Sequence, residues 1–341
     1  MLVKTKISDV VFEDSSLVLE HEKLTISDPS EWSFSMLKSA AILILEINDI
    51  CDKYGYELKD AHPWNMLFKD NKPLFIDIGS IIKKTHKKKS KWIATKEFVV
   101  GFIYPLILAH EGEFYLSKKL LNDVDCFYMK TIPASKIEAS KAILSSVRKY
   151  LLKNHPLFFV YSLLFPRKTV KAVALLSISC GSIFKKLRIR KKKTMWSNYQ
   201  TNFYKNNFDQ NEERFLRFNE ITAAINDRIS NCDSLIDLAG NSGAMSFFAM
   251  KQCSKSLKII NTDYDELAIE ASYLTFQENK IPIETYLLNF MKPYSKKTHE
   301  NFKSDIVLAL AVTHHLVLTQ KFDINFIFEK VKSYSNTYGR L

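Results

Sequence analysis

The spacing of apolar residues changes near residue 193, which divides the chain into two parts with different predicted structure. Before that point, residues 34–54, 92–110 and 134–184 have the helical spacing of apolar positions that predicts amphipathic helices. Short apolar runs at Met66–Phe68 and Leu74–Ile78 flank a polar turn, which predicts a hairpin. We therefore predict a mainly helical domain over residues 1–193.

After residue 193, short apolar runs typical of buried strands alternate with helical patterns. Strands are predicted at Ser234–Ala239, Lys258–Asp263, Ile283–Asn289 and Asp305–Val312, and helices at Glu212–Ile229, Ala244–Cys253, Asp265–Asn279 and Phe322–Ser335. Strands that are apolar along their length and alternate with helices indicate a parallel sheet covered on both faces. The sequence predicts an α/β, Rossmann-like domain over residues 194–341. Only four strands are counted, so we expect a truncated sheet or one that a partner chain completes.

The net charge narrows the classes of partner. A formal net charge of +12 over 341 residues suggests nucleic acid or a membrane until the basic residues are located. Two runs without acids, Lys83–Lys91 and Lys185–Lys193, hold 13 of the 49 basic residues, and the remaining 36 balance 37 acidic residues. We interpret the runs as solvated loops and expect no nucleic-acid partner. A peripheral membrane contact by the apolar-then-basic segment Phe158–Lys193 stays open.

Cysteine spacing and apolar segments bear on the compartment. The five cysteines form no CxxC pair and have no histidine at ligand spacing, so we expect neither a bound metal ion nor a disulfide framework. The N-terminal residues lack the apolar core of a secretory signal, and the most apolar stretch, Pro156–Pro166, is shorter than the roughly 20 residues that span a bilayer. A cytoplasmic location is the expectation.

Candidate chemistry gathers where the predicted strands end. Gly240 and Gly243 lie in the turn between the first strand and the next helix, where glycine allows positive φ and close approach of a ligand. Such a turn also occurs in many loops, so the polar residues at successive strand ends are more informative. Asp237, Asp263 and Asn289 end the first three strands, and ligands of doubly wound sheets bind at this edge.

These polar residues favour S-adenosylmethionine over a dinucleotide. Asp237 suits a ligand ammonium, Asp263 the two hydroxyls of a ribose, and Asn289 an adenine edge. A dinucleotide site requires G-x-G-x-x-G, whereas Asn241 stands at the middle glycine and Asp237 would repel a pyrophosphate. The predicted cofactor is therefore S-adenosyl-L-methionine. The residues predicted to bind it are Asp237, Gly240, Asn241, Gly243, Asp263 and Asn289.

The turn sequence DLAGNSGAMS (237–246) resembles the first motif of class I S-adenosylmethionine-dependent methyltransferases, in the form found in NoeA-like nodulation-protein methyltransferases. Similarity extends to PSEWSFSMLKSAAILIL (29–45), LKDAHPWNMLF (58–68), PLFIDIGS (73–80), KWIATKEFVVGFIYPLIL (91–108), MWSNY (195–199) and DIVLALAVTHHLVL (305–318). The resemblance covers most of the chain and implies methyl transfer to a small-molecule or carbohydrate acceptor. It also implies that the same six residues contact the cofactor. Ala239 stands where the family usually has glycine, so we expect a tighter turn.

Two histidines are the candidates for a catalytic base. His314 and His315 directly follow the fourth predicted strand, where they would face the same cleft. An oxygen acceptor for a methyl group benefits from a base that removes its proton. The alternative is that one histidine faces the core or caps the next helix.

A second pattern lies in the first part of the chain. Asp60 and Asn65 stand five residues apart, with Asp77 twelve further on and Gly79 just after. This spacing resembles the protein-kinase catalytic loop followed by D-F-G. Because no glycine-rich phosphate loop or V-A-I-K lysine precedes it, we interpret the pattern mainly as a structural remnant or a substrate-recognition element.

Three functions therefore remain open. The leading one is a class I methyltransferase with an unidentified acceptor. The alternatives are a cofactor-binding scaffold without turnover and, with less support, a phosphotransferase that uses the kinase-like motif.

Overall fold

The computed structural model describes residues 1–10, 12, 17–84, 92–122, 188–189, 194, 213–294 and 296–336. Contacts divide the chain into two units. Unit 1 comprises Met1–Leu24, Met36–Leu67 and Pro73–Lys192, and unit 2 comprises Thr25–Ser35, Phe68–Lys72 and Lys193–Leu341. The predicted boundary at residue 193 remains a prediction. The predicted helical region 134–184 lies outside the described residues, and so does all but two residues of Phe158–Lys193.

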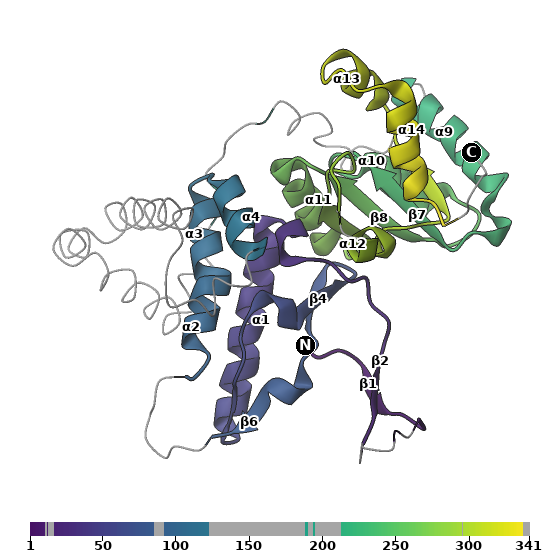
Figure 1. Ribbon diagram of the computed structural model, residues 1–341. Helices are drawn as coiled ribbons and strands as arrows, with labels where there is room; N and C mark the ends of the chain where they lie inside the picture. The colour runs from purple at the N-terminus through teal and green to yellow at the C-terminus, as the bar shows by residue number, and fades with distance from the viewer. Residues whose placement is uncertain are drawn as a thin grey trace. The chain divides into compact units, whose positions relative to one another are not determined.

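Unit 1 is built around α1 (Phe34–Lys53), which confirms the helix predicted over residues 34–54 (Figure 1). Gly55 follows it with a φ of 77°, a conformation that glycine adopts readily at helix ends. The helix predicted over residues 92–110 is also confirmed. It consists of α2 (Thr95–Phe98), a π-helical turn (Val99–Ile103) and α3 (Tyr104–His110), and α4 (Phe114–Asn122) follows.

Three two-stranded sheets accompany these helices. Strands β1 (Thr5–Ile7) and β2 (Leu19–His21) pair, as do β3 (Tyr56–Leu58) and β6 (Ile81–Lys83), and β4 (Met66–Lys69) and β5 (Lys72–Phe75). The predicted hairpin is the last of these pairs. Its turn is shorter than expected, because Asp70 and Asn71 both adopt positive φ, as two-residue hairpin turns require. The other four strands were not predicted, since three residues are too few to show an alternating pattern.

Unit 2 contains the predicted parallel sheet. It consists of β7 (Ser234–Leu238), β8 (Lys258–Asp263), β9 (Ile283–Leu287) and β10 (Ile306–Leu308), in the order β10-β7-β8-β9. The chain winds from β7 through β8 to β9 and then crosses to the opposite side of β7. The strand order therefore reverses between β7 and β10, which is the arrangement of a doubly wound sheet.

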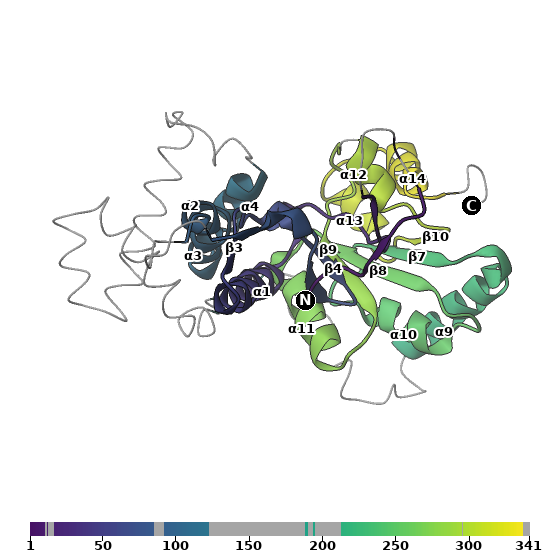
Figure 2. The same ribbon diagram turned by 90° about the horizontal axis from the view of Figure 1, so that it is seen from below.

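Helices cover both faces of this sheet. Helices α9 (Glu213–Asn226), α10 (Ala244–Gln252) and α11 (Glu266–Glu278) lie on one face, and α12 (Lys296–Asn301), α13 (Thr313–Leu318) and α14 (Ile324–Ser333) on the other (Figure 2). The prediction missed α12 and α13 and made the fourth strand too long, because Ala311 turns the chain with a φ of 54°. Among the described helices, none combines the length and apolarity needed to cross a bilayer.

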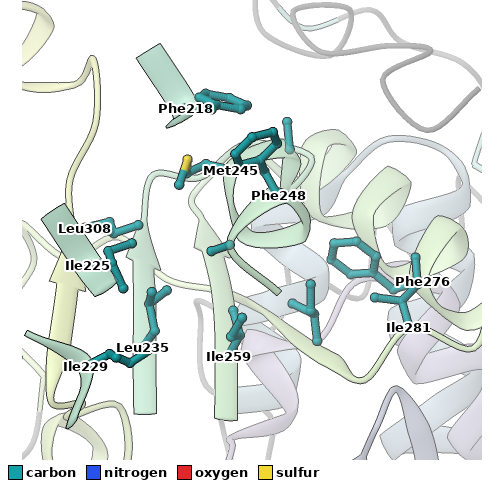
Figure 3. Close-up of a cluster of buried hydrophobic side chains, with 13 residues drawn as sticks. Phe218, Ile225, Ile229, Leu235, Met245, Phe248, Ile259, Phe276, Ile281 and Leu308 are labelled. Carbon is teal, nitrogen blue, oxygen red and sulfur yellow. The ribbon is translucent and has the colours of Figure 1, made fainter. Parts of the chain in front are cut away.

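The core of unit 2 lies between the sheet and the first group of helices. Figure 3 shows Leu235 and Ile259 on neighbouring strands, with Met245 and Phe248 on the helix that covers them. Phe248 is fully buried, and its ring meets that of Phe218 on α9 at a centroid distance of 5.5 Å. This packing fixes the start of α10 relative to the ends of β7 and β8.

Residues 25–35, although early in the chain, bind to α11. The backbone N–H of Phe34 donates to Glu266 Oε1 at 3.0 Å, and that of Ser35 donates to Glu270 Oε2 at 2.9 Å. The hydroxyls of Ser33 and Ser35 also donate to Glu270, at 2.7 and 2.5 Å. N–H groups at the start of a helix have no partner within it and favour negative charge, so the two carboxylates stabilise the backbone of Phe34 and Ser35 within unit 2.

Residues 68–72 close the outer side of the sheet. The ring of Phe68 lies 5.1 Å from that of Trp32 and 6.2 Å from that of Tyr273 on α11. The Asn71 side-chain amide donates to the carbonyl of Ile283, on the edge strand β9, at 2.5 Å. An exposed strand edge invites pairing with other chains, and this contact occupies part of that edge.

Replacing Glu270 by alanine is expected to lower the free energy of unfolding by about 2–3 kcal/mol, because a charged acceptor of three hydrogen bonds is lost. Glu278→Ala, at an exposed position of the same helix, is the matched control and should change it by less than about 0.5 kcal/mol. Denaturant unfolding followed by circular dichroism measures both. Equal losses in the two variants would contradict the role of Glu270 in holding Ser33 and Ser35.

Candidate functional site

The carboxyl end of β7 leads into a sharply bent turn. Ala239, Asn241 and Gly243 have φ values of 57°, 52° and 85°, so left-handed residues alternate with ordinary ones. The N–H of Gly240 donates to the carbonyl of Thr262 at 2.9 Å, and that of Gly243 to the carbonyl of Gly240 at 3.0 Å. The turn is therefore fastened to β8 as well as continuous with β7.

The two predicted glycines are required for different reasons. A Cβ at Gly240 would lie 2.2 Å from Asn261 Oδ1 and 2.6 Å from Asp237 Cγ, so no side chain fits there. A Cβ at Gly243 would lie 2.7 Å from Phe276 Cζ, and its positive φ also favours glycine. Ala239 adopts the left-handed conformation at a cost of about 1–2 kcal/mol, which gives a physical reason for a glycine at this position.

Asp237 lies beneath the turn. It is 1% exposed, and its Oδ2 accepts a hydrogen bond from the Ser246 hydroxyl at 2.9 Å. Burial raises the pKa of this carboxyl to about 7; the Ser246 hydrogen bond opposes the rise, and the charge of Asp263 adds to it. An ionised carboxylate at this depth is costly unless an opposite charge approaches it.

Asp263 ends β8 beside the same turn. Its Oδ2 accepts the N–H of Asn241 at 2.9 Å and its Oδ1 that of Asp265, also at 2.9 Å. Burial raises its pKa to about 6, against the lowering effect of these two N–H groups. Each carboxylate oxygen has two lone pairs, so each retains one with which to accept a ligand hydroxyl.

The two carboxyls have no cationic neighbour in the described part of the chain. None of the ion pairs formed by described residues involves Asp237 or Asp263. Among the same residues, no three or more His, Cys, Asp or Glu side chains are arranged to hold a metal ion. The site is thus a pair of buried acids whose mutual repulsion a bound organic cation would relieve.

Asn289 lies next to this pair, two residues beyond the end of β9. The backbone N–H of Leu288 donates to the carbonyl of Asp263 at 2.9 Å, which brings the two strand ends together. The Asn289 side-chain oxygen accepts the N–H of Met291 at 3.2 Å, and its backbone N–H donates to the Tyr294 hydroxyl at 3.1 Å. The structure thus orients Asn289 within its own turn, and its predicted adenine contact stays a prediction.

His314 and His315 lie in the first turn of α13, beyond the end of β10. Their rings are 3.9 Å apart between centroids; His314 is exposed and His315 is partly buried. Leu308, the last residue of β10, pairs in register with Asp237. The histidines therefore follow the strand on the opposite side of β7 from Asp263, and their role as a base stays a prediction.

Three buried residues of the site were not predicted. Asn261, Ser246 and Ser272 are completely buried on β8, α10 and α11. The Asn261 amide nitrogen donates to the carbonyl of Asn241 at 3.0 Å and to the Ser272 hydroxyl at 3.1 Å. The sequence did contain a signal for Asn261: it is a polar residue inside the apolar strand KIINTD, two positions before Asp263 and therefore on the same strand face.

The kinase-like motif comes together within unit 1. The Asn65 side-chain nitrogen donates to Asp77 Oδ2 at 3.3 Å, because the β4–β5 hairpin returns the chain to the residue before it. Ser80 holds the loop, since its hydroxyl donates to the carbonyl of Asp60 and accepts the N–H of that residue. The Asp60 side chain is partly exposed, and its Oδ2 lies 3.8 Å from Lys59 Nζ.

A doubly wound parallel sheet with a glycine turn and acids at adjacent strand ends is the arrangement of a Rossmann-like fold. No family model matches the chain. The chain is 27% identical over 339 residues to nodulation protein NoeA of Rhizobium meliloti (strain 1021), a match that covers 88% of the chain. This confirms the predicted resemblance to NoeA-like nodulation proteins. The chain spans 65% of the length of that curated relative.

One solved structure, an O-methyltransferase family protein from Burkholderia thailandensis, matches half of the chain and half of its own length. It is 14% identical with a TM-score of 0.28, which is too slight a likeness to support a function.

Replacing Gly240 by alanine is expected to cost at least about 2 kcal/mol of stability, because the new Cβ overlaps Asn261 and Asp237 in a closed interior. Gly79→Ala is the control: its Cβ would meet only Asp77 Oδ1 at 3.4 Å, an ordinary contact. Thermal unfolding of both variants measures the difference. A Gly240→Ala protein as stable as Gly79→Ala would mean that the turn is looser than the structure indicates.

Proposed function

We propose that the chain is an S-adenosylmethionine-dependent methyltransferase. The observation that supports this most is the pair of buried acids, Asp237 and Asp263, beside a glycine turn and without a cationic partner among the described residues. S-adenosylmethionine carries positive charge on its sulfonium and its ammonium, and it also has a ribose diol. It therefore supplies both the charge and the hydroxyls that these carboxylates lack.

In this proposal each residue has a distinct role. Asp263 accepts the ribose hydroxyls with the lone pairs left after its two backbone contacts. Asp237 attracts the cationic end of the cofactor electrostatically across Gly240, which has no side chain to separate them. Asn241 and Gly243 shape the turn, and Asn289 contacts the adenine edge.

The transfer itself requires little of the protein beyond positioning. S-adenosylmethionine, when bound, would supply an electrophilic methyl group, and the protein would hold an acceptor lone pair in line with it. An oxygen acceptor releases a proton, which His314 or His315 takes up in this scheme. The acceptor is a small molecule or a carbohydrate, and a scaffold that binds the cofactor without turnover is the alternative.

Calorimetry with S-adenosylmethionine and S-adenosylhomocysteine tests the cofactor assignment. The unmodified protein is expected to bind both, and Asp263→Asn to bind them about 10- to 100-fold more weakly, because charged hydrogen bonds to the ribose are lost. Asp227→Asn, an exposed aspartate on another element, is the control and should bind normally. Absence of binding by the unmodified protein would reject the assignment. Incubation with labelled cofactor and a metabolite extract then separates an enzyme from a scaffold, since only an enzyme yields a methylated product.

A second candidate, phosphotransfer by unit 1, is favoured by the contact between Asn65 and Asp77. Carboxylate and amide oxygens are donors that Mg²⁺ accepts in phosphoryl-transfer sites. If this function exists, the protein labels an acceptor from γ-labelled ATP, Asp77→Ala abolishes the labelling, and Asp49→Ala at an exposed position of α1 preserves it. No labelling by the unmodified protein, or equal labelling by all three proteins, would remove this candidate.

A further inference from the structure

Asn261 is the centre of a closed polar network under the turn. Asp237, Ser246, Asn261 and Ser272 are each 1% exposed or less. The orientation of the Asn261 amide is fixed, because the carbonyl of Asn241 can only accept and must therefore face Nδ2. Its Oδ1 consequently faces the Ser246 hydroxyl at 3.4 Å.

One hydroxyl serves two acceptors in this network. Ser246 lies 2.9 Å from Asp237 Oδ2 and 3.4 Å from Asn261 Oδ1, and its single proton satisfies the nearer acceptor when Asp237 is ionised. Both acceptor atoms crowd the α-carbon of Gly240, since a Cβ there would lie 2.2 Å from Asn261 Oδ1 and 2.7 Å from Asp237 Oδ2. When Asp237 is protonated, a proton in the network becomes available to hydrogen-bond with Asn261 Oδ1. The Asn261 side chain therefore favours the protonated form of Asp237.

The opposite end of the same amide holds the turn. Asn261 Nδ2 binds the carbonyl of Asn241, whose φ is 52° and whose N–H donates to Asp263 Oδ2. A change in the protonation of Asp237 therefore acts through the Asn261 amide on Asn241, whose N–H orients Asp263.

We infer that Asn261 is a positioning residue that couples the protonation of Asp237 to the shape of the turn, so that arrival of the cationic cofactor expels a proton from the network. This inference rests on the proposed function for the identity of the ligand. The titratable group that faces Asp237 is Asp263, on β8, which itself faces Asp265. From α10, the Ser246 hydroxyl contacts the Asp237 carboxyl, and Leu308 on β10 pairs with Asp237 in register; neither side chain carries a charge.

The ligand arm of the test is calorimetry with S-adenosylmethionine near pH 6.5 in buffers of different ionisation enthalpy. The unmodified protein should release a fraction of a proton on binding, and Asp237→Asn should release less. Asn261→Ala should bind at least tenfold more weakly and also release less. Asn261→Asp adds a third acid and should move the pH midpoint of binding upward. The control, Asn325→Ala at an exposed position, should match the unmodified protein.

The ligand-free arm measures the free energy of unfolding against pH. A raised native pKa means that the folded protein holds a proton that the unfolded chain has released, so stability should fall as pH rises from about 4 to about 7. Asn261→Ala should show a shallower fall than the unmodified protein, and Asn325→Ala the same fall. Circular dichroism first establishes that each variant is folded.

The two arms separate the two claims. Absence of cofactor binding by the unmodified protein, together with a shallower pH slope in Asn261→Ala, rejects the methyltransferase proposal and supports the coupling of Asn261 to Asp237. Binding and proton release by Asn261→Ala that equal those of the unmodified protein overturn the inference. An unchanged pH slope in Asn261→Ala overturns it whether or not the cofactor binds.

Discussion

The close approach of the Gly240 backbone to two buried polar groups, Asp237 and Asn261, is the constraint on which the site depends. It requires glycine at one position, a fully buried acid at the end of β7 and a buried amide in the middle of β8. Core packing beneath α10 holds these strands in register, with Asp237 opposite Asn261. The turn therefore fits against Asp237 and Asn261 only because residue 240 has no side chain.

This arrangement is costly for the ligand-free protein. Two acids are desolvated near each other, and Ala239 occupies a conformation that disfavours its side chain. Costs of this kind are tolerated where the surrounding structure determines the geometry and where function uses it. The repulsion between the two desolvated acids destabilises the ligand-free site, and a ligand with positive charge would relieve it. Because such a ligand would bind only the folded protein, it would also stabilise the fold by mass action.

The positions of residues at strand ends could be predicted from the sequence, whereas their role in binding stays a prediction. Asp237, Asp263 and the two glycines were predicted because parallel strands bring their carboxyl ends to one edge, and this holds whatever the side-chain packing. Asn261, Ser246 and Ser272 were missed because their importance lies in contacts between β8, α10 and α11. The joining of residues 25–35 and 68–72 to unit 2 was also missed, since bonds such as Ser35 to Glu270 link positions 235 apart and have no local pattern.

Under the proposed function, the strand order of unit 2 would place the cofactor-binding acids and the candidate base on different strands. The acids belong to β7 and β8, whereas His314 and His315 follow β10 on the far side of β7. A ligand held by the two acids would thus have its nucleoside on the β8 and β9 side and its reactive end toward the point where strand order reverses. Under the proposed function, residues that select the acceptor would lie near α13, and because loops vary freely on one fold, the sequence alone does not identify the acceptor.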